Sequence, residues 1–154
     1  MRAGSQRPVE FRPLRRGDIP SLVRMSRENM AAIVKSSWGM EWQDEPLLEW
    51  FMDKDIQTEV LEEGGEAVGY YSLEPIDKYL FITSVQLRKD HQGKGHGRHL
   101  MERIEDIARQ QGADGVELCV QDSNDNAKGF YDHIGYSVIC RRGNNFLMRK
   151  RLGR

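Results

Sequence analysis

Glycines occupy alternate positions in the segment "QGKGHG", directly after a strongly apolar stretch of the chain. Gly93, Gly95 and Gly97 carry no side chain, so the backbone can curl there and a ligand can approach its N–H groups. A helical apolar pattern starts just beyond them, and the first turn of a helix favours an anion. The segment therefore predicts a phosphate-binding loop, to which Lys94 and His96 can add charge. A glycine-rich turn without a ligand is the alternative.

Two familiar nucleotide loops do not fit this segment. A P-loop requires Ser or Thr directly after its Gly-Lys pair, whereas Lys94 is followed by Gly95. A dinucleotide fingerprint requires glycine three positions after its second glycine, and Arg98 or Leu100 stands there, depending on the glycine from which one counts. The phosphate would therefore belong to a different kind of loop.

A second group of residues with chemical potential lies in the segment "NDNAKGFYDHIGY". Tyr131 can donate a proton, but Phe130 and Tyr131 can equally be core aromatics of an amphipathic helix. Asn124 can bind a ligand or cap that helix, a position for which asparagine is preferred. Cys119 and Cys140 have neither metal spacing nor the density of a disulfide framework, so we expect core thiols and no metal site.

The elements before the glycines read as an antiparallel beginning of a sheet. Residues 9–14 alternate as a strand, and a helix follows to about residue 36, with Asp18 as its predicted N-cap. Residues 45–54 predict a second helix, which leaves Trp38 and Trp42 in or beside a loop. Residues 58–74 predict a hairpin around "EEGG", and residues 78–87 predict a buried central strand.

The elements after the glycines predict one parallel unit. Leu100, Ile104 and Ala108 mark the buried face of a helix that ends at Gly112, on which Glu105 and Arg109 are spaced as an i,i+4 pair. A strand over residues 115–120 then implies a right-handed parallel crossover. A helix over about 124–133 and a hairpin over 136–152 close the chain. The predicted class is α/β, a mixed twisted sheet flanked by about four helices.

Composition limits the function classes further. A chain of 154 residues is predicted to form a single domain, with residues 1–7 and 152–154 as flexible tails. Its 23 basic residues balance 24 acidic ones, which argues against nucleic-acid binding and against a charged membrane surface. The start shows no signal peptide and no run has membrane-spanning length, so we expect a cytoplasmic protein without membrane attachment. A homodimer is one expectation, because edge strands of such a sheet can pair.

Two spaced motifs resemble the GNAT superfamily of acyl-CoA-dependent N-acetyltransferases. Gln92, Gly95 and Gly97 satisfy its signature Q/R-x-x-G-x-G/A. The later segment resembles the family pattern N-x-x-A, aromatic-Tyr, Gly-aromatic. The residues at those places are Asn124, Ala127, Phe130, Tyr131, Gly135 and Tyr136. The similarity covers residues 84–138, and the order of elements before it agrees.

The resemblance implies where acetyl-CoA binds. The loop of Gln92, Gly93, Lys94, Gly95, His96, Gly97 and Arg98 would hold the pyrophosphate, with Asn124 as a further contact. The strands on either side of the loop and its helix would splay apart and admit pantetheine, which pairs with the backbone of Val85 and Leu87. His96 belongs to this loop, but its side chain is expected to face solvent, as is that of His133.

The resemblance also implies direct transfer of the acetyl group to a primary amine of a small molecule or of a protein N-terminus. The Leu87 N–H would bind the thioester oxygen, and Tyr131 would protonate the departing thiolate. Many relatives place a glutamate on the long central strand, but "KYLFITSVQL" contains no carboxylate. The general base therefore stays open among Glu41, Asp44, Glu45, Glu74, Asp77 and water. A catalytically inactive CoA-binding sensor or scaffold is the alternative function.

Overall fold

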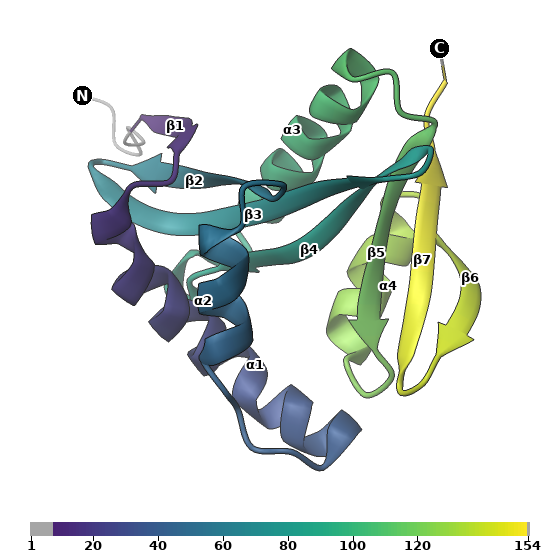
Figure 1. Cartoon of the computed structure of the whole chain (residues 1–154), viewed down its shortest axis with the longest axis horizontal. Helices are drawn as coiled ribbons and strands as arrows, with labels where there is room; N and C mark the ends of the chain where they lie inside the picture. The colour runs from purple at the N-terminus through teal and green to yellow at the C-terminus, as the bar shows by residue number, and fades with distance from the viewer. Residues whose placement is uncertain (1–7, 154) are drawn as a thin grey trace.

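One mixed seven-stranded sheet organises residues 8–153, which the computed structural model describes (Figure 1). The strand order is β1-β2-β3-β4-β5-β7-β6, and only β4 and β5 are parallel neighbours. The strands are β1 (Val9–Pro13), β2 (Gln57–Glu63), β3 (Glu66–Ile76), β4 (Tyr79–Leu87), β5 (Gly115–Gln121), β6 (Ser137–Arg142) and β7 (Asn145–Arg151). The predicted mixed α/β sheet with one parallel unit is confirmed.

Four α-helices flank the sheet within the described part of the chain. They are α1 (Ile19–Trp38), α2 (Glu45–Met52), α3 (His96–Gln110) and α4 (Asp125–His133). Short 3-10 helices, η1 (Arg16–Asp18) and η2 (Lys89–His91), lead into α1 and into the glycine loop. Each helix was predicted, with ends that differ by at most two residues. Within residues 8–153, no helix has both the length and the apolar character that a membrane crossing requires.

Two apolar clusters attach the helices to opposite faces of the sheet. On one face, the Tyr70 ring packs in a cluster with Leu22 of α1 and Phe51 of α2. On the other face α3 buries Leu100 and Ile104 among side chains of β3, β4 and β5. Side chains of α4, including Tyr131, pack against this second cluster. The sheet is therefore covered on both sides, as its central apolar strands require.

The parallel pair β4 and β5 separates partway along its length. Their pairing extends only from Tyr79 opposite Gly115 to Ile82 opposite Leu118. A register shift follows at once, because Ser84 and Ile82 face consecutive residues of β3 and leave Thr83 as an extra residue. Beyond it the two strands diverge, which gives the sheet the V-shaped opening seen between them in Figure 1.

Two polar side chains have partners that differ from our predictions. Asp18 precedes α1, but its carboxylate accepts hydrogen bonds from the Arg12 guanidinium at 2.8 and 2.9 Å and from the Arg15 N–H, and does not cap the helix. Glu105 does not pair with Arg109, which binds Asp106 instead. The Glu105 carboxylate turns inward to the Tyr136 hydroxyl at 2.9 Å and the Lys150 ammonium at 3.1 Å.

Two expectations about burial are also corrected. Cys140 is exposed on the edge strand β6, and only Cys119 is partly buried. Leu152, which we placed at the start of a flexible tail, is buried, and its N–H donates to the Asp114 carbonyl at 2.9 Å. The apolar side chain and the backbone bond hold the chain in place to this residue. Residues 1–7 and 154, assigned to the tails, lie outside the described residues.

Candidate functional site

The glycine loop runs from the end of η2 into the first turn of α3. Gly93 and Gly95 have φ values of 78° and 89°, in the left-handed region that favours glycine. The first helical bond of α3 joins the His99 N–H to the Gly95 carbonyl at 3.2 Å. The N–H groups of His96, Gly97 and Arg98 come before that bond. As in any first turn of an α-helix, they have no hydrogen-bond acceptor within the helix. The loop thus offers bare amides at the positive end of a helix dipole.

A cavity of about 550 Å³ lies against this loop, and we call it the loop cavity. The loop residues that line it are Gln92, Gly93, Gly95, Gly97 and Arg98, together with Val85, Leu87, Asn124 and Tyr131. Lys89, which the sequence analysis did not single out, also lines it. The cationic side chains Lys89 and Arg98 and the helix N-terminus therefore face the same space. This combination of charges and amides suits a phosphate.

The C-terminal part of β4 directs backbone groups into the opening between β4 and β5. The Arg88 N–H donates to the Val68 carbonyl of β3 at 2.8 Å. Hydrogen-bonded pairs alternate along an antiparallel ladder, so the N–H and C=O groups of Val85 and Leu87 point away from β3. Since β5 has already diverged, it supplies no partner strand to these groups. The structure thus brings both predicted backbone positions to the opening.

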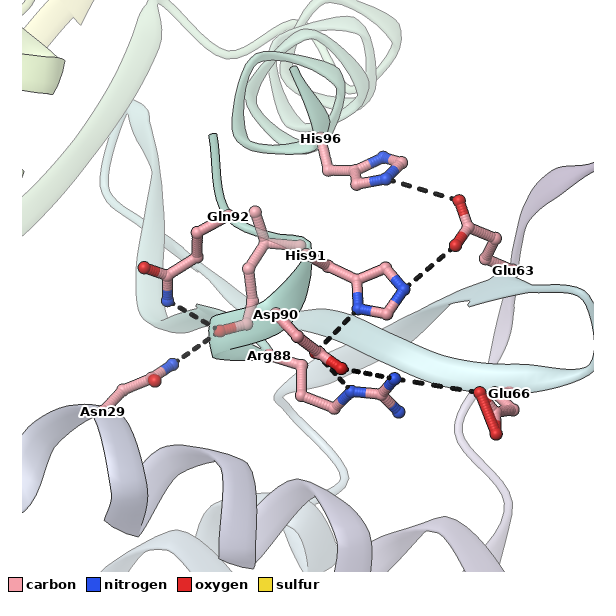
Figure 2. Close-up of polar contacts among 9 residues, drawn as sticks. Asn29, Glu63, Glu66, Arg88, Asp90, His91, Gln92 and His96 are labelled. Atoms are coloured by element: carbon pink, nitrogen blue, oxygen red, sulfur yellow. Dashed lines mark hydrogen bonds and ion pairs between the residues drawn. The ribbon is translucent and has the colours of Figure 1, made fainter. Parts of the chain in front are cut away.

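The Leu87 carbonyl is held by the side-chain amides of Asn29 and Gln92, both of which are labelled in Figure 2. The Asn29 Nδ2 of α1 donates to it at 2.6 Å, and the Gln92 Nε2 donates at 3.0 Å. The Asn29 Nδ2 also reaches the Gln86 Oε1 at 3.1 Å. These bonds fix the peptide at the end of β4 to α1 and to the loop. Gln92 thus uses its side-chain donor within the protein, and Asn29 is a site residue that no local motif indicated.

His96 is not solvent-facing, and its ring does not line the loop cavity. It is buried, and its Nε2 lies 3.4 Å from a Glu63 carboxylate oxygen at the end of β2. The other Glu63 oxygen lies 3.0 Å from the His91 Nε2, and the His91 Nδ1 lies 2.8 Å from Asp90 (Figure 2). One carboxylate therefore joins the two histidines that flank the glycines. Lys94 is exposed and is not among the described residues lining the cavity.

A second cavity of about 340 Å³ adjoins the loop cavity, and we call it the tryptophan cavity. Trp38, Trp42 and Trp50 line it from the α1 and α2 side. The residues that line both cavities are Met30, Val85, Gln86, Asn124, Ala127 and Tyr131. The shared wall makes one continuous path from the glycine loop, along the opening of the sheet, to the tryptophans.

Tyr131 lies where the two cavities meet. Its hydroxyl has no hydrogen-bond partner among the described residues, and its ring packs edge-on against Phe130 and Tyr136. Burial raises the pKa of the Tyr131 phenol to about 12, so it carries its proton at neutral pH. The neighbouring Tyr136 hydroxyl is instead bonded to Glu105. Of these two tyrosines, Tyr131 has the hydroxyl that is available to a ligand.

Asn124 fulfils the structural alternative considered for it. Its side-chain oxygen accepts a hydrogen bond from the Ala127 N–H at 3.3 Å, which caps α4. The residue still lines both cavities. His133, at the end of the same helix, is exposed as expected.

Few ionisable groups line the tryptophan cavity. Glu41 is its only carboxylate among the described residues, and the Lys35 ammonium holds the pKa of that carboxyl below its usual range. Burial raises the pKa of the Cys119 thiol, so this side chain remains protonated. The other lining polar groups include Ser26 and Ser84, whose hydroxyls lie 2.6 and 2.8 Å from the buried Tyr70 hydroxyl. Neither a thiolate nor a strand carboxylate is therefore present there.

Among the described residues, Asp44 and Glu74 do not line the tryptophan cavity. The Asp44 carboxylate accepts hydrogen bonds from the Arg27 guanidinium and the Trp42 indole, which lower its pKa. Within residues 8–153, no group of three or more His, Cys, Asp and Glu residues is arranged to hold a metal ion.

Comparison with known proteins identifies a family. The model of the acetyltransferase (GNAT) family matches residues 25–136. An uncharacterized N-acetyltransferase from the pepI 3' region of Lactobacillus delbrueckii subsp. lactis is 27% identical over 165 residues, which cover 88% of this chain and 92% of that protein.

Solved structures share the fold. The PaiA N-acetyltransferase of Thermoplasma acidophilum, solved in complex with coenzyme A, is 21% identical with a TM-score of 0.74, covering 94% of this chain and 99% of that one. The ribosomal-protein-S18-alanine N-acetyltransferase of Escherichia coli is 18% identical with a TM-score of 0.74, covering 96% of each chain. Together with the family match, these similarities show that the chain is a GNAT-family N-acetyltransferase with the CoA-binding fold of that family.

Proposed function

We propose that this protein transfers an acetyl group from acetyl-CoA directly to a primary amine, and that Tyr131 supplies the proton for the leaving thiolate. The observation that carries the proposal is the continuous path from the glycine loop to the tryptophan cavity, with Tyr131 and its unpartnered hydroxyl in the wall that the two cavities share within the described residues. A cofactor at one end and an amine at the other would meet beside this hydroxyl.

The residues of the loop cavity fit CoA. The amides of His96, Gly97 and Arg98, with the charges of Lys89 and Arg98, would hold the diphosphate. The backbone N–H and C=O groups of Val85 would pair with the pantetheine amides as an added strand does, and the Leu87 N–H would face the acyl end of the cofactor. When bound, acetyl-CoA supplies an acyl group activated as a thioester.

Two groups of the chain would act on the reacting atoms. The Leu87 N–H points into the opening and can donate to the acyl oxygen, and the bonds from Asn29 and Gln92 fix the following peptide of β4. The Tyr131 hydroxyl holds its proton at neutral pH and can give it to the departing sulfur. Cys119 remains a thiol, which supports transfer without an acyl-cysteine.

The amine must lose a proton before or during its attack. An amine with a pKa near 10.4 requires about 4 to 5 kcal/mol for this at neutral pH, and an α-amine near 7.8 requires only about 1 kcal/mol. Glu41 is the lining carboxylate, but its pairing with Lys35 at an exposed position makes it a weak base. We therefore assign the proton transfer to water that enters the tryptophan cavity.

The absence of a carboxylate from β4 favours a second candidate function, that of a CoA-binding module without turnover. Both candidates are separated by measuring release of free thiol from acetyl-CoA with a panel of primary amines, alongside calorimetry of CoA binding. Amine-dependent thiol release that falls in Tyr131→Phe supports the proposed enzyme. Tight CoA binding with no release above the rate without amine would refute transfer and favour the binding module.

A further inference from the structure

The tryptophan cavity indicates the chemical class of the acceptor. We propose that the acceptor is a small primary amine on an uncharged apolar body, without a carboxylate or phosphate group. This inference rests on the proposed transfer to an amine and specifies its substrate. Three features of the cavity carry it: the charge of its wall, its apolar surface and its closure on one side.

The described wall offers no cationic side chain to an anionic group. Among the described residues that line the cavity there is no Lys, Arg or His, and the only lining carboxylate is Glu41. Placing a carboxylate beside this wall would remove its water without giving it a cationic partner, which is strongly unfavourable. Glu41 is paired with the Lys35 ammonium, so this carboxylate leaves no unpaired cation for an anionic acceptor. Amino acids and phosphorylated amines are therefore poor acceptors.

The apolar surface is large and partly exposed. Trp38 and Trp50 are 39% and 38% exposed, and Met40 is 55% exposed. All three line the cavity, together with Met30 and Val34 of α1. Large apolar side chains gathered at the mouth of a cavity are stabilised when a ligand covers them. Indole rings also attract an ammonium group, so they favour an amine with an apolar body over a neutral apolar molecule.

Hydrogen bonds bridge the elements that border one side of the cavity, and this bridge would obstruct an extended peptide there. The Ser37 hydroxyl near the end of α1 meets the Ser123 hydroxyl at 2.5 Å and accepts from the Ser123 N–H at 3.1 Å. The Trp38 indole N–H donates to the Asn145 side chain at 3.2 Å. The end of α1 is thus joined to the β5–α4 loop and to the β6–β7 hairpin, near which it lies in Figure 1. A volume of about 340 Å³ behind this bridge suits a small molecule.

A matched set of amines tests the proposal with the full chain and acetyl-CoA. 2-Phenylethylamine has the proposed character, L-phenylalanine adds a carboxylate, and L-phenylalaninamide replaces that carboxylate by a neutral amide. Spermidine and a peptide beginning with phenylalanine complete the set. We expect kcat/KM for L-phenylalanine to be at least about 100-fold below that for 2-phenylethylamine, and L-phenylalaninamide to recover most of the difference. Spermidine and the peptide should each react at least about 10-fold more slowly than 2-phenylethylamine.

A variant tests the charge argument independently. Gln43→Arg places a cation on the wall of the cavity, and we expect it to raise kcat/KM for L-phenylalanine about 10-fold without a similar gain for L-phenylalaninamide. Gln57→Arg, at an exposed position on β2 that does not line the cavity, is the control and should change neither.

The outcomes separate this inference from the proposed function. Preference for L-phenylalanine, spermidine or the peptide over 2-phenylethylamine would overturn the acceptor class while leaving amine acetylation intact. Thiol release with none of the five amines would count against the proposed function itself and, with it, against this inference.

Discussion

The loop cavity and the tryptophan cavity adjoin each other but are built in different ways. The loop cavity presents backbone groups, and polar contacts hold the segments that carry them: Asn29 and Gln92 bind the Leu87 carbonyl, and Glu63 joins His91 to His96. The tryptophan cavity presents side chains, with indoles and thioethers partly exposed at its mouth. The first arrangement suits a ligand that is always the same, and the second allows the acceptor to be set by a few side chains.

The difference explains which cavity can be recognised in a sequence. A phosphate held by consecutive amides needs glycines at fixed spacing, and this requirement leaves a short local pattern. A wall of side chains drawn from α1, α2, β4 and β5 needs no fixed spacing, because the fold brings its members together from distant positions. Substitutions can test whether the two cavities are as separable as this comparison implies.

The largest effect is expected from Gly95→Val. A branched side chain at a φ of 89° strains the backbone and occupies the approach to the amides, so we expect CoA affinity to fall at least about 100-fold, or about 2.7 kcal/mol. Calorimetry measures this loss. Gly112→Val is the matched control, because Gly112 also has a positive φ, 74°, but lies at the far end of α3. Similar losses of affinity in both variants would show that strain, and not the loop, controls binding.

A smaller effect, confined to turnover, is expected from Tyr131→Phe. Loss of the proton donor should lower kcat about 100-fold while CoA affinity changes little. Because burial raises the pKa of the phenol to about 12, the kcat ratio of the two proteins should stay constant from about pH 7 to about pH 10. Tyr136→Phe is the control: its hydroxyl binds Glu105, so it should lower stability and leave kcat unchanged. Equal kcat in wild type and Tyr131→Phe would remove Tyr131 as the acid.

The smallest effect is expected from Asn29→Ala. It deletes one of the two donors to the Leu87 carbonyl, worth about 1 kcal/mol, so the KM for acetyl-CoA should rise about fivefold. Steady-state kinetics at saturating amine gives this value, and circular dichroism checks that α1 is intact. Glu28→Ala, at an exposed neighbouring position, should leave the KM unchanged. An unchanged KM in Asn29→Ala would show that Gln92 alone suffices to hold the end of β4.

Most of the fold could be predicted because local patterns and topology agree. The apolar strand over residues 78–87, the glycines and the amphipathic α3 defined the parallel unit without any distant information. The errors concern partners that lie far apart in sequence. Leu152 was assigned to a flexible tail because it stands next to the end of the chain, but β7 brings it beside Asp114. Glu105 was assigned to the surface, but Tyr136 and Lys150 enclose it.

The candidate site shows the same limit. The loop glycines, Val85, Leu87 and Tyr131 were placed from the motifs and their order, and they line one continuous path. Asn29 could not be found, because its partner Leu87 is 58 positions away. His96 was predicted to face solvent because it occupies a spacer position between glycines, yet the end of β2 supplies Glu63 to bury it. Such contacts depend on register between distant strands, which no local pattern specifies.

Residue-level hydrogen exchange with and without CoA tests the central claim most directly, namely that bare amides of β4 and the first turn of α3 hold this cofactor. We predict that CoA slows exchange at Val85, Leu87, His96, Gly97 and Arg98 more than elsewhere in residues 8–153. Protection centred on other segments, with these five amides unchanged at saturating CoA, would contradict the account.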